Sequence, residues 1–165
     1  MTRTPMIACL ALLGAAACAF GQDGVRVEPT VFHGPRPLAA QTQASVIRDY
    51  LQAWTSLDAA LGQNRAGLLD QDFVGVARTK FAQTIQDQEK FGLRTRYQKQ
   101  SHDIQIIFYS PEGLSIQLVD NIEYSEQLLD HGKIVATQPV RARYIAVLTP
   151  SEVRWRVRVL QSEAQ

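Results

Sequence analysis

Apolar residues in the first half of the chain recur at intervals of three and four positions. Between residues 43 and 61 this spacing forms a single helix face, made up of Val46, Ile47, Tyr50, Leu51, Trp54, Leu57 and Leu61. Gly62 is expected to end this helix, and residues 64–70 are expected to form a short helix or turn. A second apolar stripe over residues 75–91 predicts another helix, which stops at Gly92.

The second half of the chain changes to the alternating pattern that is typical of β-strands. The four predicted strands cover residues 95–109, 114–124, 134–148 and 153–160. Proline and glycine mark the turns between them, as Pro111 with Gly113, Gly132, and Pro150. Because all three connections are short, the strands are expected to form an antiparallel meander. Pro139 interrupts the third strand and indicates a bulge or a sheet edge there.

Helices followed by a meander predict an α+β domain over residues 43–161. In this domain the N-terminal helices pack on a curved four-stranded antiparallel sheet, which closes over them as a cone. Residues 22–42 contain three prolines and two glycines, so they are expected to form an extended linker or arm.

The first 21 residues have the pattern of a secretory signal peptide. Arg3 supplies the positive charge, and residues 6–20 form an apolar run that is too short to span a bilayer comfortably. Small residues predict cleavage either after Ala19 or just before Gln22. An uncleaved anchor and lipoprotein processing at Cys18 are the alternatives. We therefore expect an exported protein, either periplasmic or secreted.

Cysteine and charge content narrow the function classes. The two cysteines both lie in the predicted signal, so the rest of the chain offers no disulfide, no thiolate nucleophile and no cysteine metal ligand. The 17 basic and 16 acidic residues become balanced once Arg3 is removed, which argues against a nucleic-acid or anionic-membrane binder. No segment after residue 21 is apolar enough to span a membrane. Three scattered histidines give no metal-ligand spacing, and no nucleotide or other cofactor motif is present in the sequence, so we expect no cofactor.

The last predicted strand indicates which side of the sheet faces the helices. Its apolar residues Trp155 and Val157 alternate with arginines, which are rarely buried without a partner. If Leu148 pairs with Val153 across the turn, the outer face carries Arg141, Arg143, Arg154, Arg156 and Arg158. These arginines form either a solvated face balanced by acids such as Glu123, or a surface for an acidic partner, a second copy or an envelope protein.

The same reasoning predicts which residues of the earlier strands point inward. Pairing Leu128 with Ile134 turns an apolar row toward the helices, with one acid in it: Leu118, Asp120, Ile122 and Tyr124. Pairing Tyr109 with Leu114 places Asp103 opposite Asp120 and turns His102 outward. A slip of one residue would send each of these side chains to the other face.

Asp120 is the member of this inner row that indicates chemistry. Two carboxylates that face each other in an apolar pocket cannot both ionise easily, so Asp120 with Asp103 could act as a general acid or base. Alternatively, Asp120 lies near the rim of the sheet, where solvent, a tyrosine or an arginine satisfies it.

Two features together resemble the nuclear transport factor 2-like superfamily. They are the helix pattern Tyr50-Leu51-x-x-Trp54-x-x-Leu57-Asp58 before a four-strand meander, and the closing strand around Trp155. The resemblance covers residues 43–161 and implies a cone in which a bent sheet wraps a long helix. The superfamily includes ketosteroid isomerase, scytalone dehydratase, polyketide cyclases and many non-catalytic binding domains. Its enzymes often use an aspartate with a histidine or tyrosine in the cone, which Asp120, Tyr109, Tyr124 and Tyr144 match by position.

Three functions fit these observations. The first is a non-catalytic binding domain whose cavity accepts an apolar small molecule and is lined by Tyr50, Trp54, Leu118, Ile122, Tyr144 and Trp155. The second is a small isomerase, dehydratase or cyclase, in which Asp120 is the base and a tyrosine donates to the developing oxyanion. The third is a structural role in an envelope assembly through the outer arginines.

Overall fold

The computed structural model describes residues 24–30 and 36–163. The predicted signal peptide, both of its cleavage sites and the alternative processing at Cys18 lie outside these residues. Within the described residues, no helix combines the length and the apolar character needed to span a bilayer.

The observed elements follow the predicted order of helices and then strands. They are β1 (Val25–Val27), α1 (Ala40–Gln63), the 3-10 helix η1 (Ala66–Leu69), α2 (Gly75–Lys90), β2 (Leu93–Tyr109), β3 (Ile116–Asp130), β4 (Lys133–Pro150) and β5 (Trp155–Ser162). The α+β class and the cone are confirmed, but the sheet has five strands rather than four. The additional strand, β1, comes from the extended arm and pairs in parallel with β2.

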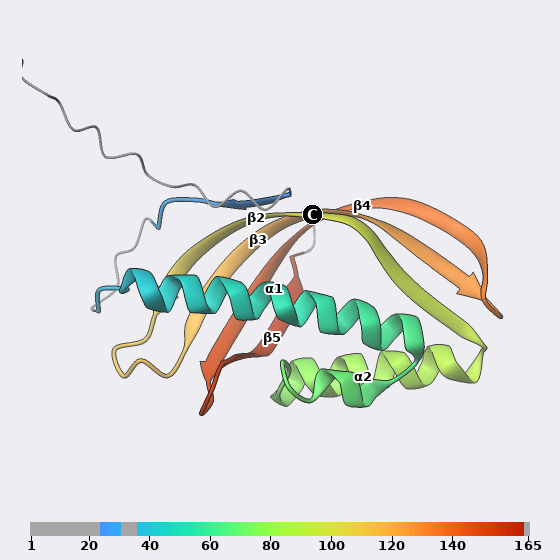
Figure 1. Cartoon of the computed structure of the whole chain (residues 1–165), viewed down its shortest axis with the longest axis horizontal. Coiled ribbons are helices and arrows are strands. Elements are labelled where there is room, and N and C mark those ends of the chain that lie inside the picture. Colours follow the sequence, from blue (N-terminus) through green and yellow to red (C-terminus); the bar gives the residue numbers. More distant parts are fainter. Residues whose placement is uncertain (1–23, 31–35, 164–165) are drawn as a thin grey trace, which may run out of the picture.

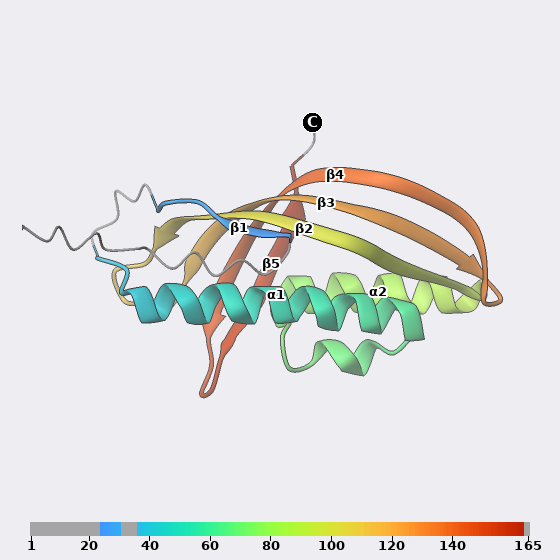
Figure 2. The ribbon, with the colours of Figure 1, turned by 45° about the horizontal axis from the view of Figure 1, so that its top comes forward.

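The long strands bend over the helices as an arch. Strand order is β1-β2-β3-β4-β5, and the last four strands form the predicted antiparallel meander. Figure 1 shows α1 running beneath the arch with α2 beside it, so both helices lie on the concave face of the sheet. Figure 2 shows the same arrangement from another angle, with the opposite face of the sheet turned away from α1.

The core fills the space between α1 and the concave face. The apolar stripe of α1 is buried there, and its residues include Val46, Tyr50, Trp54, Leu57 and Leu61. The sheet supplies a matching row of aliphatic side chains, which includes Ile104, Ile106, Leu118, Ile122 and Leu148. Burial of each such side chain contributes about 1.5–3 kcal/mol to folding.

Helix α1 continues past the predicted stop at Gly62. It ends at Asn64, which adopts a left-handed conformation with φ of 53° and whose N–H bonds the carbonyls of Ala60 and Leu61. Asparagine tolerates this conformation better than most residues do. The Asn64 side chain also donates to the Leu93 carbonyl at 2.9 Å, which ties the helix end to the start of β2.

Gly92 follows α2 as predicted and has a positive φ of 69°. A Cβ atom at this position would lie 2.9 Å from the His131 ring, although that ring is exposed and can turn aside.

Gly92→Ala is therefore expected to lower the free energy of unfolding by about 1–2 kcal/mol, chiefly through the strained backbone. Urea unfolding followed by circular dichroism measures this loss. Gly67→Ala is the control, because a Cβ there meets nothing within 4 Å, and an equal loss in both variants would contradict the prediction.

The register between β3 and β4 differs from the prediction by an even number of residues. Asp120 pairs with Tyr144, and Ile122 pairs with Ala142. Because side chains alternate with a period of two, the predicted inward row of β3 keeps its face. Leu118, Asp120 and Ile122 are all buried between the sheet and α1.

The register between β2 and β3 differs by an odd number, and the predicted faces of β2 are wrong. The turn is longer than expected because Ser110 Oγ accepts the N–H groups of Leu114 and Ser115, so that Tyr109 pairs with Ile116. This change of two residues keeps the faces, but a bulge between Ile106 and Phe108 then shifts the pairing back by one residue and reverses them. As a result His102 turns inward opposite Ile122, whereas Asp103 pairs with Asn121.

The last strand begins later than predicted. The main chain and side chain of Ser151 both bond Arg154, so residues 151–154 form the turn, and Val153 is 82% exposed. Leu148 therefore pairs with Val157 rather than with Val153. A second irregularity at Val147 and Leu148 turns Leu160 into the core in place of Val159.

Candidate functional site

A buried carboxylate lies at the centre of the cone. β3 carries Asp120 into the space above α1, where the residue is 0% exposed. The hydroxyl of Tyr50, from α1, donates to Asp120 Oδ2 over 2.9 Å. His102 Nδ1, from β2, lies 2.7 Å from the same oxygen, and a carboxylate accepting there leaves the ring proton on Nδ1. We call these three residues the Asp120 centre.

Two buried polar atoms in and beside the Asp120 centre lack a hydrogen-bond partner among the described residues. Asp120 Oδ1 is buried and has no donor among the described residues. Trp54 Nε1, beside the Tyr50 hydroxyl, is a buried donor, but no acceptor among the described residues meets it in hydrogen-bond geometry. Buried polar atoms are nearly always paired, so each of these atoms calls for a water molecule or a ligand group.

Aromatic side chains surround the Asp120 centre. Trp54 packs against His102 with ring centroids 5.7 Å apart, and against Tyr50 at 6.5 Å. Three tyrosines complete the set around Trp54, with centroid distances of 6.1 Å for Tyr97, 6.3 Å for Tyr124 and 5.3 Å for Tyr144. We call Trp54 and these three tyrosines the aromatic shell. Tyr97 and Tyr144 are partly exposed, so the shell extends from the Asp120 centre to the surface.

The buried phenols are held in their neutral form. Burial raises the pKa of Tyr50 well above its usual 10.0, and the nearby Asp120 charge adds to this rise. Burial likewise raises the pKa of Tyr97 and of Tyr124, with a further contribution from Tyr144 in both cases. All three hydroxyls therefore remain hydrogen-bond donors throughout the physiological pH range.

The raised pKa of Tyr50 predicts a loss of stability in alkali. The unfolded chain releases the phenol proton above about pH 10, whereas the folded chain keeps it, so this stabilisation is complete below pH 10 and falls as the pH rises. Above about pH 10, the free energy of unfolding is therefore expected to fall less steeply with pH in Tyr50→Phe, by about 1.4 kcal/mol per pH unit. Urea unfolding at a series of pH values from neutral upward measures the slope. An unchanged slope in the variant would show that Tyr50 ionises equally in both states.

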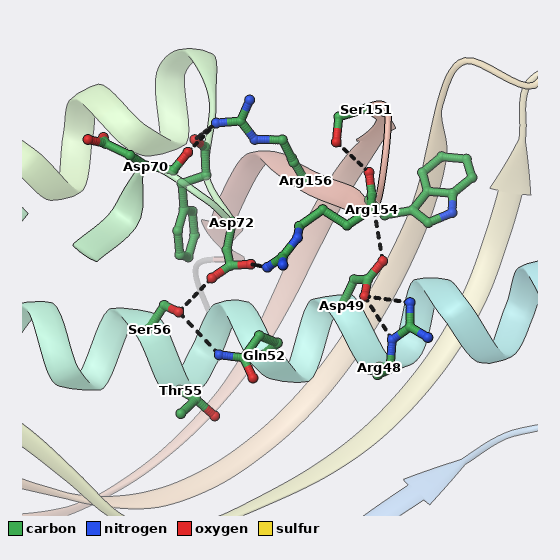
Figure 3. Close-up of polar contacts among 12 residues, drawn as sticks. Arg48, Asp49, Gln52, Thr55, Ser56, Asp70, Asp72, Ser151, Arg154 and Arg156 are labelled. Atoms are coloured by element: carbon green, nitrogen blue, oxygen red, sulfur yellow. Dashed lines mark hydrogen bonds and ion pairs between the residues drawn. The ribbon is translucent and has the colours of Figure 1, made fainter. Parts of the chain in front are cut away.

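A polar network fixes α1 against the start of β5 and so places Tyr50 (Figure 3). Asp49, which precedes Tyr50, is buried and accepts the Trp155 N–H over 2.8 Å. Asp72 is also buried, and its two oxygens accept from Ser56 Oγ at 2.6 Å and Arg154 Nη1 at 2.8 Å. Because these bonds connect α1, the segment after η1 and β5, rotation of α1 away from the sheet would break them.

Solved structures show the fold of this chain, whereas no protein-family model and no curated protein matches the sequence. The intermembrane space region of the chloroplast protein ARC6 is 17% identical with a TM-score of 0.60, over 79% of this chain and 100% of that one. A putative scytalone dehydratase from Novosphingobium aromaticivorans is 14% identical with a TM-score of 0.53, over 76% of this chain and 89% of that one. The protein Aln2 from a Streptomyces species is 12% identical with a TM-score of 0.50, over 78% of this chain and 93% of that one. The chain has the nuclear transport factor 2-like fold.

The nuclear transport factor 2-like cone brings together only part of the predicted site. Tyr124 and Tyr144 lie in the aromatic shell, and Leu118 and Ile122 flank Asp120 in the core. Asp103 points to the outer face, so the predicted pair of facing carboxylates is wrong. Tyr109 lies elsewhere in the cone, with its ring 6.5 Å from Trp155 and beneath the Arg36 guanidinium. Trp155 accompanies Tyr109 and has no ring contact with Trp54 among the described aromatic pairs.

The sequence reasoning missed His102 of the Asp120 centre and Tyr97 of the aromatic shell. His102 begins a row that continues with Ile104 and Ile106, and all three side chains are buried. This alternation is visible in the sequence, and it favours an inward His102 independently of the turn. The register argument took the opposite face because it extended the pairing from the turn without the bulge between Ile106 and Phe108.

The five outer arginines do not form one surface. Arg141 pairs with Glu123 at 3.1 Å and Arg143 with Glu163 at 2.9 Å on the outer face. In contrast, Arg154 pairs with Asp72, Arg156 donates to the carbonyls of Asp70 and Phe73, and Arg158 packs against Gly75. The start of β5 packs on this segment, where Phe73 forms a bridge with Val157. A dimer or envelope contact at the outer face stays a prediction.

Residues 24–30 and 36–163 contain no cluster of three histidine, cysteine or acidic side chains suited to a metal ion. The Asp120 centre and the aromatic shell offer the chemistry of their own groups. These are a buried carboxylate, an imidazole held by that carboxylate, and neutral phenol and indole donors.

Proposed function

We propose that this protein is an exported, non-catalytic binding domain that holds a small, mostly apolar molecule in its cone. The observation that carries the proposal is the incompletely paired Asp120 centre inside the aromatic shell. Asp120 Oδ1 and Trp54 Nε1 are two of the five buried side-chain atoms that have no partner among the described residues, and both belong to the cone. A ligand hydroxyl that reaches both atoms would donate to Asp120 Oδ1 and accept from Trp54 Nε1. The aromatic shell supplies apolar contacts around such a hydroxyl.

The burial of the Asp120 centre favours binding over turnover. Asp120 is 0% exposed and His102 is 6% exposed, so a reacting molecule reaches them only if the aromatic shell opens. A domain that binds and releases its ligand slowly tolerates this arrangement, whereas an enzyme has to repeat the opening in every cycle.

A comparison of 2-naphthol with naphthalene tests the binding function. Both molecules are planar and apolar, but only 2-naphthol has a hydroxyl group. We expect 2-naphthol to raise Tm and to quench tryptophan fluorescence saturably, with naphthalene at least about tenfold weaker. Asp120→Leu should remove the preference for the hydroxyl. Equal affinity for both compounds, or binding of neither, would count against the proposed site.

The second candidate is a small acid-base enzyme, and the His102–Asp120 pair favours it. A carboxylate that holds Nδ1 of a histidine orients the ring, so that its other nitrogen can accept and return a proton. A neutral tyrosine of the shell could donate to a developing oxyanion. One of the proteins with this fold is described as a putative scytalone dehydratase. We therefore keep an isomerase, dehydratase or cyclase as the alternative.

Turnover separates the two candidates. The protein is incubated with an excess of a β-hydroxy ketone, and the ultraviolet absorbance of the enone measures its dehydration. A binding domain leaves the substrate unchanged, whereas an enzyme consumes many equivalents and loses activity in His102→Leu. Product formation that persists in His102→Leu would exclude the role given to this histidine.

Export is the part of the proposal that rests on the first 21 residues. Arg3 followed by the apolar run of residues 6–20 supports a signal peptide. Mass spectrometry of the protein from a cell-envelope fraction is expected to find an N-terminus at Phe20 or Gln22. A lipid-modified N-terminus at Cys18 would indicate a lipoprotein, and an intact Met1 would exclude cleavage.

A further inference from the structure

The face of the sheet opposite α1 carries a second polar site. A depression of about 510 Å3 lies there, across β1, β2, β3 and β4. Strand pairing places four of its side chains in one row, in the order Arg26, Asp103, Asn121 and Arg143. Glu123 and Arg141 pair beside this row and line the same depression. We call it the outer depression. His102 of the Asp120 centre is also among its lining residues, although the imidazole turns to the other face of the sheet, toward Asp120.

The basic side chains of the outer depression keep donors available to a ligand. Arg26 pairs with Glu28, Arg141 with Glu123 and Arg143 with Glu163. The side chains of the three arginines are nevertheless 73%, 80% and 50% exposed. A guanidinium has five N–H donors, and one carboxylate occupies at most two of them, so these arginines can also bind an anionic group.

Asp103, the carboxylate in the row of the outer depression, requires a hydrogen-bond donor from a ligand. Asp103 Oδ1 is buried and has no donor among the described residues. Its neighbour in the row, Arg26, pairs with Glu28 instead. A carboxylate oxygen that is removed from water without a donor is costly, so this position favours an N–H group, and an ammonium group most of all.

We propose that the outer depression binds a small zwitterion, namely a free amino acid or a short peptide. The ammonium group lies at Asp103, and the carboxylate lies at Arg143 and Arg141. Asp103 and Arg143 are two strands apart, which is about 10 Å between backbones, and their side chains shorten this gap. An extended dipeptide spans about 7 Å and so reaches both groups. Because all of these residues are on paired strands, the site needs little rearrangement to bind.

Glycylglycine is the probe that tests this site, with two analogues that each lack one charge. Adding it to the purified protein is expected to shift the backbone amide resonances of Asp103, Asn121 and Arg143 saturably. N-acetylglycine lacks the ammonium group and glycinamide lacks the carboxylate, so each should bind at least about tenfold more weakly. Asp103→Asn and Arg143→Gln should each weaken glycylglycine by a similar factor. Arg94→Gln, an exposed change outside the depression, should leave its affinity unchanged.

Several results would overturn the proposal. No saturable shift up to about 10 mM glycylglycine would show that the depression is not a site for this ligand class. Equal binding of N-acetylglycine would show an anion surface that does not use Asp103. Unchanged affinity in Asp103→Asn would exclude the ammonium position, and the near-identical shape of asparagine makes misfolding a poor explanation. Shifts confined to Tyr50 and Trp54, which do not line the depression, would place the ligand in the cone instead.

Discussion

Trp54→Ala is expected to lower the free energy of unfolding by about 3–5 kcal/mol, which is a large share of the stability of a domain of this size. Trp54 is 2% exposed and contacts the rings of His102 and four tyrosines. Truncation removes the apolar area and leaves a cavity at the centre of the aromatic shell, whose other members cannot all move to fill it. Urea unfolding followed by circular dichroism measures the change.

Two further variants separate the roles of Trp54. Trp155→Ala truncates a half-buried indole outside the aromatic shell, so its loss should be clearly smaller. Trp54→Phe keeps an aromatic ring but removes the Nε1 donor. It should cost much less stability than alanine and yet weaken the binding of 2-naphthol. A stability loss below about 1 kcal/mol in Trp54→Ala would mean that the shell is not packed as the structure shows.

The layout of the fold was predictable because it depends on patterns that extend over many residues. The three- and four-residue period before residue 91 and the alternation after it determine the element types. The inward face of β3 was also predicted correctly, since an even error in register does not change the face. The parallel strand β1 was missed because three residues in a proline-rich arm carry almost no periodic signal.

The composition of the site was harder to predict because it depends on single residues. The bulge between Ile106 and Phe108 changes which side chains of β2 point inward, whereas the longer turn held by Ser110 shifts the pairing by two residues and leaves the faces unchanged. As a result His102 lies beside Asp120, where the prediction had placed Asp103. The later start of β5 shifts its pairing by four residues and keeps its faces, but Arg156 and Arg158 are in contact with the segment of residues 70–75, which packs on this edge strand. Local irregularities therefore decide the chemistry of this cone, whereas they leave its architecture unchanged.

His102→Leu is expected to lower the free energy of unfolding by about 3 kcal/mol, the second large effect in this molecule. The change removes the donor that lies 2.7 Å from Asp120 Oδ2 and leaves the carboxylate with the Tyr50 hydroxyl alone. Because Asp120 is fully buried, water cannot replace the lost donor without opening the cone. Leucine fills most of the imidazole volume, so the loss reports the polar contact rather than a cavity.

The double variant His102→Leu with Asp120→Asn tests this explanation. Asparagine keeps the shape of the side chain and still accepts from Tyr50, but it carries no charge. If the cost of His102→Leu comes from an uncompensated buried charge, the double variant should be more stable than His102→Leu alone, by about 1–2 kcal/mol. Additive losses in the two positions would mean that His102 and Asp120 contribute independently. The pair would then have no energetic coupling, and the candidate acid-base role, in which Asp120 orients the ring, would lose its physical basis.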